Sequence, residues 1–245
     1  MILFTCVVYP SFLSNEMIKD GIHDTFYMST SVLKKDNFPL FFCLGLASTF
    51  IYMNDSTMAS KLQSDALKDL EPLGNFMGHP LIIVPLFSAT YTYGYFMDTS
   101  YKKPSFLTLK SVIISNVIVH SLKLSFHRYR PKTNQGTSSF DGPSLSLNDD
   151  TLSFPSSHSA TAFSVATVFS ELYPSTSVIS YALASFVAWS RIQSRNHFPS
   201  DVFVGALIGH FTAKTVIGLN HHTPSMSLIP YASRNSLAVL LQYRF

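Results

Sequence analysis

Six apolar runs separated by short polar turns constrain the fold of this 245-residue chain more than any other feature. A helix that crosses a bilayer needs about 20 apolar residues, with a range of about 17 to 25. Because the first, fourth and fifth runs are shorter and the later ones are rich in Ser and Thr, buried helices of a soluble all-α protein remain an alternative. We predict an all-α helical bundle with about six membrane-embedded helices, approximately at residues 38–53, 79–97, 106–124, 159–173, 177–190 and 202–219.

The composition is unusual for a water-soluble domain and excludes several classes of function. Charged residues are 13% of the chain, about half of the ~25% that is typical, and hydrophobic residues are 47%. The net charge is only +3 with no long basic tract, so we predict no nucleic-acid partner. The cysteines, Cys6 and Cys43, have no neighbouring His or Cys at ligand spacing, which excludes a disulfide framework and a zinc knuckle.

Lysine pairs suggest which ends of the runs face the cytoplasm. One pair precedes the first run and another lies in the turn between the second and third runs, and short cytoplasmic loops are enriched in such residues. Residues 125–158 and 190–201 would then lie on the opposite side. The first of these segments contains several cations, namely Arg128, Arg130 and Lys132. Cations on the side away from the cytoplasm are an exception to the enrichment of Lys and Arg in cytoplasmic loops, so we expect them to have a functional reason.

Three further segments complete a single domain over residues 1–245. Residues 54–78 mix apolar and charged residues, as in an amphipathic helix that rests on a membrane or on the bundle, and a solvated connecting helix is an equal alternative. The polar stretch 133–150 is predicted to be a loop. Residues 220–245 are an extended tail, in which alternation from Leu237 onward is typical of a strand.

Polar residues that are suited to catalysis or to binding a ligand form three clusters. The topology above puts all three clusters on one side of the bundle. The first cluster lies at the end of the third run, the second at the start of the fourth, and the third between the fifth and sixth. Their members are Lys123, Arg130 and Pro131; Pro155, Ser156, Ser157 and His158; and Ser190, Arg191, His197 and Asp201.

The clusters together have the chemistry of an oxyanion site. Lys123, Arg130 and Arg191 supply cations, and an arginine fork suits bidentate binding of phosphate. The backbone N–H groups near Ser157 and His158 would lie at a helix N-terminus, where free donors and the helix dipole favour an anion. We therefore predict a pocket for a dianionic phosphoryl group.

Two histidines add what phosphoryl transfer needs beyond positive charge. His197 lies four residues before Asp201, a spacing that lets the carboxylate hydrogen-bond the imidazole, fix its tautomer and raise its nucleophilicity. His158 can donate a proton to the departing oxygen. Lone histidines such as His79 are interpreted as core or surface residues. Arg128 lies between Lys123 and Arg130 of the first cluster, where it could contact the headgroup of a lipid.

Ten of these eleven positions resemble the three-part signature of the type 2 phosphatidic acid phosphatase superfamily, which includes membrane lipid phosphatases, soluble class A bacterial acid phosphatases and vanadium haloperoxidases. The resemblance covers residues 123–201 directly and implies a metal-independent phosphohydrolase without a cofactor. It implies that His197 attacks phosphorus to form a phosphohistidine, that Asp201 orients His197, and that His158 protonates the leaving group. It also implies a set of phosphate-binding residues, namely Lys123, Arg130, Arg191, Ser156 and the backbone amide of Ser157.

One position departs from the family pattern, because Ser157 stands where the family has glycine. Its Cβ narrows the approach to the phosphate, so we expect a narrower substrate range. The expected substrate is a membrane lipid phosphate or diphosphate, such as phosphatidic acid, phosphatidylglycerophosphate, a polyprenyl diphosphate or a lipid A phosphate, met in a bacterial inner membrane with the site facing the periplasm. The alternatives are a soluble periplasmic acid phosphatase and a noncatalytic phospholipid-binding or transport protein, and the oligomeric state stays open.

Overall fold

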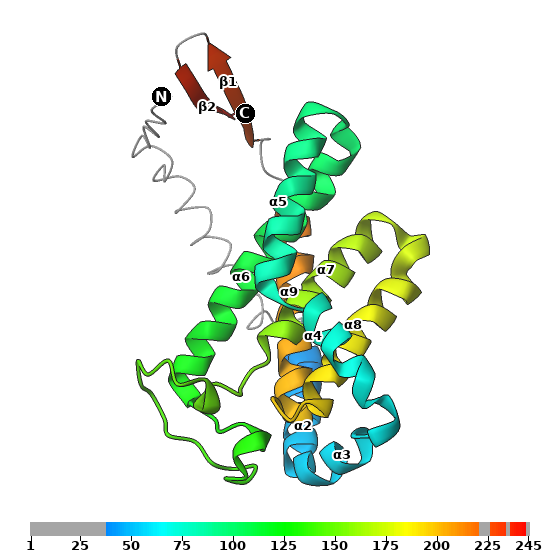
Figure 1. The fold of residues 1–245 in the computed structure, drawn as a ribbon, viewed down its shortest axis with the longest axis vertical. Helices are drawn as coiled ribbons and strands as arrows, with labels where there is room; N and C mark the ends of the chain where they lie inside the picture. Colours follow the sequence, from blue (N-terminus) through cyan, green and yellow to red (C-terminus); the bar gives the residue numbers. More distant parts are fainter. Residues whose placement is uncertain (1–37, 221–225, 234–235, 244–245) are drawn as a thin grey trace.

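The computed structural model describes residues 38–220, 226–233 and 236–243. Each of the six predicted apolar runs is a helix, and the described part is a helical bundle, so the predicted fold class is confirmed (Figure 1). Two short helices precede the second of these runs. The helices are α2 (Phe38–Met53), α3 (Asp55–Leu62), α4 (Glu71–Met77), α5 (Pro80–Phe96), α6 (Lys102–Phe126), α7 (Ser157–Leu172), α8 (Ser177–Gln193) and α9 (Pro199–Asn220).

Fewer helices meet the length and apolarity of a membrane span than the six predicted. Among the described residues, Thr99–Phe126 and Pro199–Asn220 are long and apolar enough. A third candidate is the pair Asp65–Met77 and Pro80–Phe96, which is bent by 50° at its break. Because α2 has only 16 residues and α7 and α8 are short and rich in Ser and Thr, the count of six is approximate.

Helix α7 is the centre of the bundle and packs against α6, α8 and α9. Leu107, Val168 and Val216 are buried together where α6, α7 and α9 meet. Gly205 permits a close approach, since a Cβ there would lie 2.4 Å from the carbonyl oxygen of Ser156. The start of α9 therefore lies directly against the start of α7, which joins the second and third clusters.

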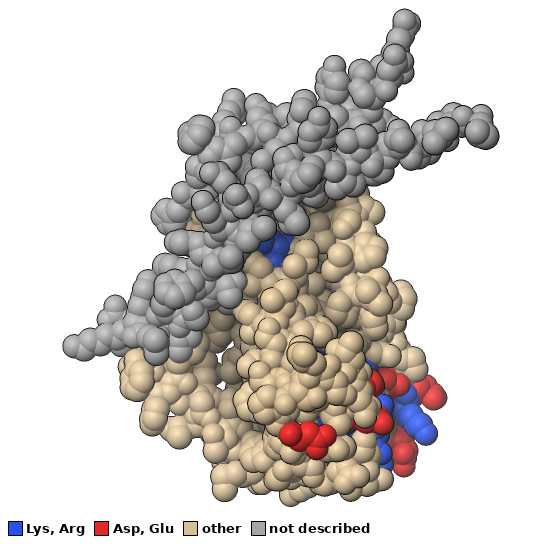
Figure 2. All heavy atoms as spheres, turned by 90° about the vertical axis from the view of Figure 1, so that its left-hand side faces the viewer, with Lys and Arg blue, Asp and Glu red and all other residues tan. Residues whose placement is uncertain are grey.

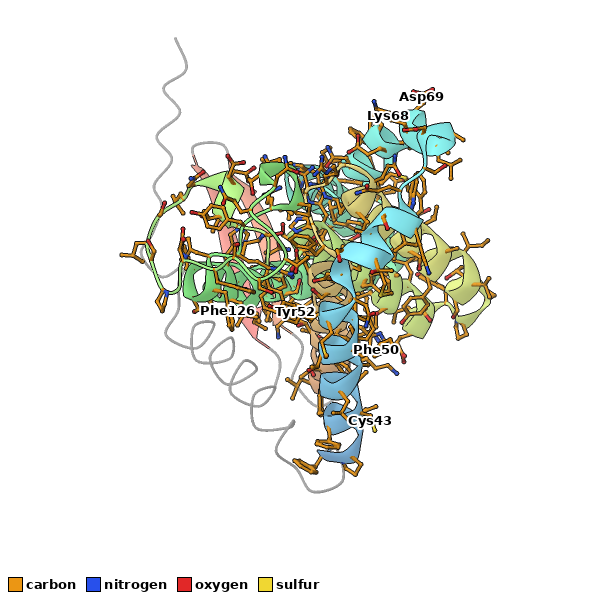
Figure 3. The ribbon with its side chains drawn as sticks, turned by 90° about the horizontal axis from the view of Figure 1, so that it is seen from below. Cys43, Phe50, Tyr52, Lys68, Asp69 and Phe126 are labelled. Carbon is orange, nitrogen blue, oxygen red and sulfur yellow. The ribbon has the colours of Figure 1, made fainter. Side chains whose placement is uncertain are left out.

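Apolar side chains cover much of the outside of the bundle. Helix α2 packs on α9 through the rings of Phe41 and Phe211, 5.0 Å apart, while Phe50 and Cys43 are exposed along its length (Figure 3). On the face shown in Figure 2, the described charged residues gather mostly at one end. Cys6 lies outside the described residues.

The segment predicted as one amphipathic helix, residues 54–78, is instead divided into α3, a 3₁₀ helix (Asp65–Leu70) and α4. The break falls at Gln63 and Ser64, whose backbones are extended. Gln63 Nε2 donates to the carbonyl oxygen of Ile192 (3.1 Å), and Ser64 N donates to Gln193 Oε1 (2.9 Å). Hydrogen bonds to the end of α8 thus replace those that a continuous helix would make.

The tail contains the strand predicted from its alternating pattern. That strand is β2 (Ser236–Tyr243), and it pairs antiparallel with β1 (Met226–Ser233), with Met226 opposite Tyr243. The first strand was not predicted, because its sequence lacks the clear alternation of the second.

Candidate active site

The cations of the first cluster lie at the end of α6 and just beyond it. Helix α6 ends at Phe126, and its C-cap His127 has a left-handed backbone (φ 43°) that turns the chain out of the helix. Lys123, in the last turn, is buried and donates from Nζ to the carbonyl oxygen of Leu152. Arg130 is 9% exposed and donates to Asp149 Oδ1 (2.5 Å) and Asn196 Oδ1 (2.9 Å). The first cluster is thereby tied to the third.

The second cluster forms the start of α7, as predicted. Ser156 is the N-cap, and its hydroxyl accepts from Ser159 N (3.4 Å), while its own N–H donates to the carbonyl oxygen of Asp201 (3.0 Å). Ser157 is the first helical residue and is not among the described residues with positive φ. Its backbone conformation is therefore one that ordinary residues adopt, as its Cβ requires.

Nε2 of His158 is buried and has no hydrogen-bond partner among the described residues. Arg191 is 4% exposed and donates from Nη1 to Asn75 Oδ1, and its Nε is likewise buried without a partner in the described part of the chain. Buried polar atoms are usually paired, so these two atoms are suited to a ligand.

His197 is 2% exposed and differs from the prediction in its hydrogen bond. Nδ1 lies 2.6 Å from the carbonyl oxygen of Ser153 and 3.9 Å from Asp201 Oδ2. Because a carbonyl oxygen only accepts, Nδ1 carries the proton and Nε2 keeps its lone pair. The tautomer that the predicted attack requires is therefore set by Ser153, while the Asp201 carboxylate is nearby without a direct hydrogen bond.

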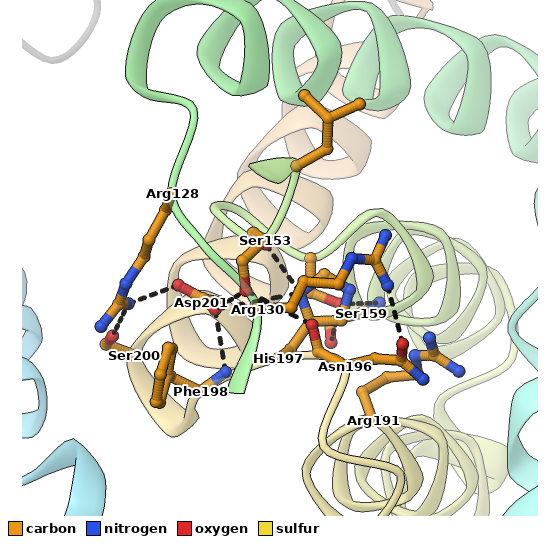
Figure 4. Close-up of polar contacts among 12 residues, drawn as sticks. Arg128, Arg130, Ser153, Ser159, Arg191, Asn196, His197, Phe198, Ser200 and Asp201 are labelled. Atoms are coloured by element: carbon orange, nitrogen blue, oxygen red, sulfur yellow. Dashed lines mark hydrogen bonds and ion pairs between the residues drawn. The ribbon is translucent and has the colours of Figure 1, made fainter. Parts of the chain in front are cut away.

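The oxygens of Asp201 are occupied by other donors, which explains the difference. Oδ2 accepts from the hydroxyl of Ser153 (2.6 Å) and from Phe198 N (2.8 Å), and Oδ1 accepts from Arg128 Nη1 (2.5 Å) (Figure 4). Ser153 thus links Asp201 to His197 through its hydroxyl and its carbonyl.

Arg128 is completely buried, so the contact with a lipid headgroup that the sequence allowed is not available to it. Its guanidinium lies between Asp201 and Asp55, donating to Asp55 Oδ2 at 2.7 Å, and stacks on the ring of Phe198 at 4.2 Å. Asp55 also accepts from Ser200 N (2.9 Å) at the start of α9. The sequence signal for Arg128 was a cation next to the first cluster, whereas no local signal marked Asp55, Ser153, Asn75 or Asn196.

Burial and charge keep both histidines neutral. Burial, followed by the charge of Lys123, holds the pKa of His197 well below its usual value of 6.5. Burial, followed by the charge of Arg191, also lowers the pKa of His158. A buried cluster of neutral imidazoles and three cations favours an anion, and binding of an anion favours a proton on His158.

The geometry can be compared with known proteins. The family model described as PAP2 superfamily matches residues 105–222. A lipid A 1-phosphatase of Porphyromonas gingivalis is 40% identical over 96 residues, which are 38% of this chain and 18% of that protein. A lipid A 1-phosphatase of Rhizobium etli is 32% identical over 108 residues, which are 44% of this chain and 47% of that protein.

The matched regions thus span less than half the length of these relatives. Among solved structures, Aquifex aeolicus LpxE is similar with 23% identity and a TM-score of 0.49, over 67% of this chain and 94% of that one. All three polar clusters fall inside the region that the family model matches. The resemblance inferred from them is confirmed, because residues 105–222 match the model of the PAP2 superfamily.

Proposed function

We propose that this protein is a membrane lipid phosphatase that removes phosphate from a lipid phosphate or diphosphate without a metal, through a phosphohistidine. One observation carries the proposal: the imidazole of His197 is buried, and the carbonyl of Ser153 holds its proton on Nδ1 (2.6 Å), which leaves the lone pair on Nε2. The cationic pocket around this imidazole supports a phosphoryl group as its target.

The proposed reaction has two steps. Nε2 of His197 attacks phosphorus, the bond from phosphorus to the leaving oxygen breaks, and His158 gives its proton to that oxygen. A water molecule then attacks the phosphohistidine and passes a proton to His158, the phosphorus–nitrogen bond breaks, and phosphate leaves. Asp201, 3.9 Å from Nδ1 of His197, stabilises the positive charge that the imidazole gains on attack.

The phosphoryl oxygens would be bound by groups of all three clusters. Lys123, Arg130 and Arg191 are buried cations, and their effect on a bound anion is strong because their side chains are largely shielded from water. The N-terminus of α7, at Ser156 and the amide of Ser157, adds the dipole of a helix.

The names of the curated relatives make a lipid A phosphate the first substrate to test, within a panel that also contains phosphatidic acid, phosphatidylglycerophosphate and a polyprenyl diphosphate. The test measures phosphate release by detergent-extracted protein in EDTA, with His197→Ala and a matched His120→Ala, since His120 is an exposed histidine on α6. We expect release that is lost in His197→Ala and kept in His120→Ala. No release on any substrate by the folded wild-type protein would contradict the proposal and favour a noncatalytic lipid-binding role.

We also propose that the site faces the periplasm from the inner membrane. Leu145, 88% exposed in the loop between α6 and α7, offers a probe of this orientation. Leu145→Cys in a background with Cys6→Ser and Cys43→Ser should react with a maleimide that cannot cross membranes, when the maleimide is added to cells whose outer membrane has been opened. Labelling only after the inner membrane is disrupted would place the loop in the cytoplasm.

A further inference from the structure

The segment that ends α4 and turns into α5, residues 74–79 (the α4–α5 turn), lies outside the region matched by the family model and still contacts two members of the site. It packs close to α7 and α8, since a Cβ on Gly78 would lie 2.3 Å from Val187 Cγ1 and 3.4 Å from His158 Cβ. Asn75, in the last part of α4, contacts Arg191, and His79, the N-cap of α5, contacts His158.

Asn75 orients Arg191 without neutralising it. Its amide oxygen accepts a hydrogen bond from Nη1, while the Nε of the same guanidinium is buried and unpartnered among the described residues. Nε and Nη2 form the opposite, two-donor edge, which matches two oxygens of a phosphoryl group. By contrast, Arg130 is paired with the carboxylate of Asp149. A neutral acceptor on Nη1 leaves the full charge of Arg191 for an anion.

His79 confines the ring of His158. The two ring centroids are 5.1 Å apart and the rings are nearly perpendicular, at 88°. His79 is itself anchored, because its Nδ1 accepts from Leu81 N (3.2 Å) as the N-cap of α5. Since Nε2 of His158 has no partner in the described residues, packing rather than a hydrogen bond at that atom sets its direction.

We infer that this turn is a fourth part of the active site, in which Asn75 and His79 are positioning residues for Arg191 and His158. The inference rests on the proposed phosphatase function, and it adds groups that act through the two clusters rather than on the substrate directly.

The contact between Asn75 and Arg191 is tested by a double-mutant cycle with orthovanadate as the phosphate analogue, its binding measured by calorimetry on the full chain in detergent. Asn75→Ala should weaken binding roughly tenfold, the order expected for a hydrogen bond to a charged group. In an Arg191→Ala background the same change should alter binding less than about twofold, because the group that it orients is absent.

The control for loss of an amide is Gln135→Ala, since Gln135 is exposed in the loop after α6, and its binding should equal that of the wild type. Equal weakening by Asn75→Ala in both backgrounds, or no weakening in the wild-type background, would overturn the role of Asn75.

The contact between His79 and His158 is tested by kcat/KM for two soluble substrates. His79→Asn keeps an N-cap acceptor but removes the ring, so folding is preserved. Because His158 protonates the leaving group, kcat/KM should fall roughly tenfold for hexyl phosphate and change little for p-nitrophenyl phosphate, whose leaving group needs no proton. His79→Phe, which restores a ring, should recover most of the loss, and His120→Asn serves as the matched control.

Equal losses on both substrates, or no recovery in His79→Phe, would overturn the positioning role of His79. These outcomes are distinct from failure of the proposed function. If the wild type cleaves neither substrate, the phosphatase proposal fails with it, whereas an active wild type with unaffected variants contradicts only the role of the turn.

Discussion

The proposed reactivity of His197 depends on its charge state as well as on its tautomer. Its pKa lies well below 6.5 because of burial and then of Lys123, so the imidazole stays neutral at pH 6.5 and gains a proton only as the pH falls through the lowered value. We predict that kcat/KM for p-nitrophenyl phosphate, corrected for the ionisation of the ester itself, stays level from about pH 7.5 to about pH 5.5. An acid limb centred at about 6.5 after this correction would contradict the assignment.

Ser157 is the residue at which the chain departs from the PAP2 pattern, and its Cβ stands at the start of α7 beside the proposed phosphate site. Ser157→Gly should widen the approach and raise the activity toward the poorest lipid of the panel several-fold relative to the best. The measurement is the ratio of kcat/KM values for these two lipids. Ser159→Gly, two residues further along α7 at a fully buried position, serves as the comparison. An unchanged ratio would show that Ser157 does not limit the range.

At the scale of elements, Arg128 joins α3 to the start of α9 through Asp55 and Asp201. Arg128→Ala would leave two buried carboxylates without their cation, and removal of one member of such a group costs about 3 to 5 kcal/mol. We predict a large fall in the thermal unfolding midpoint in detergent. The fall should be smaller for Arg128→Lys, which keeps the positive charge but loses the planar guanidinium that can bind two carboxylates at once.

Arg195→Ala is the control for this prediction, because Arg195 is exposed and donates to Asn134 Oδ1 (2.6 Å). Its effect should stay within about 1 kcal/mol, as for most surface polar contacts. Equal stability of Arg128→Ala and Arg195→Ala would show that the buried group does not hold α3 against α9.

For the whole molecule, exposed apolar side chains on α5 and α6 fit contact with lipid, as Leu81 is 78% and Val117 is 61% exposed. We predict that the protein remains in the membrane fraction after an alkaline carbonate wash and is released by detergent. Val117→Lys should reduce that fraction, since a charge at the centre of a span costs about 2.5 to 3.5 kcal/mol. Leu145→Lys, in the loop, should not. Recovery of the wild type without detergent would favour the soluble acid phosphatase.

The helices and the site were predictable to different degrees. Long apolar runs predicted the six main helices, and motif spacing predicted that Lys123, His158 and His197 would meet. The break at Gln63 could not be predicted, because it depends on hydrogen bonds to residues 129 positions away. The four-residue spacing correctly brought Asp201 to 3.9 Å from His197, but competing donors decided which group receives the hydrogen bond.

By itself, the sequence determined the helical bundle and the three polar clusters, and it predicted their phosphate chemistry, because hydrophobic runs, helix starts and motif spacings are encoded by residues close together in the chain. Only the tertiary structure decided which acceptor each buried group takes: Ser153 for His197, Asp55 for Arg128, and Asn75 for Arg191. These partners lie 44, 73 and 116 residues apart, and a buried polar group must pair with whatever the packed helices bring near it.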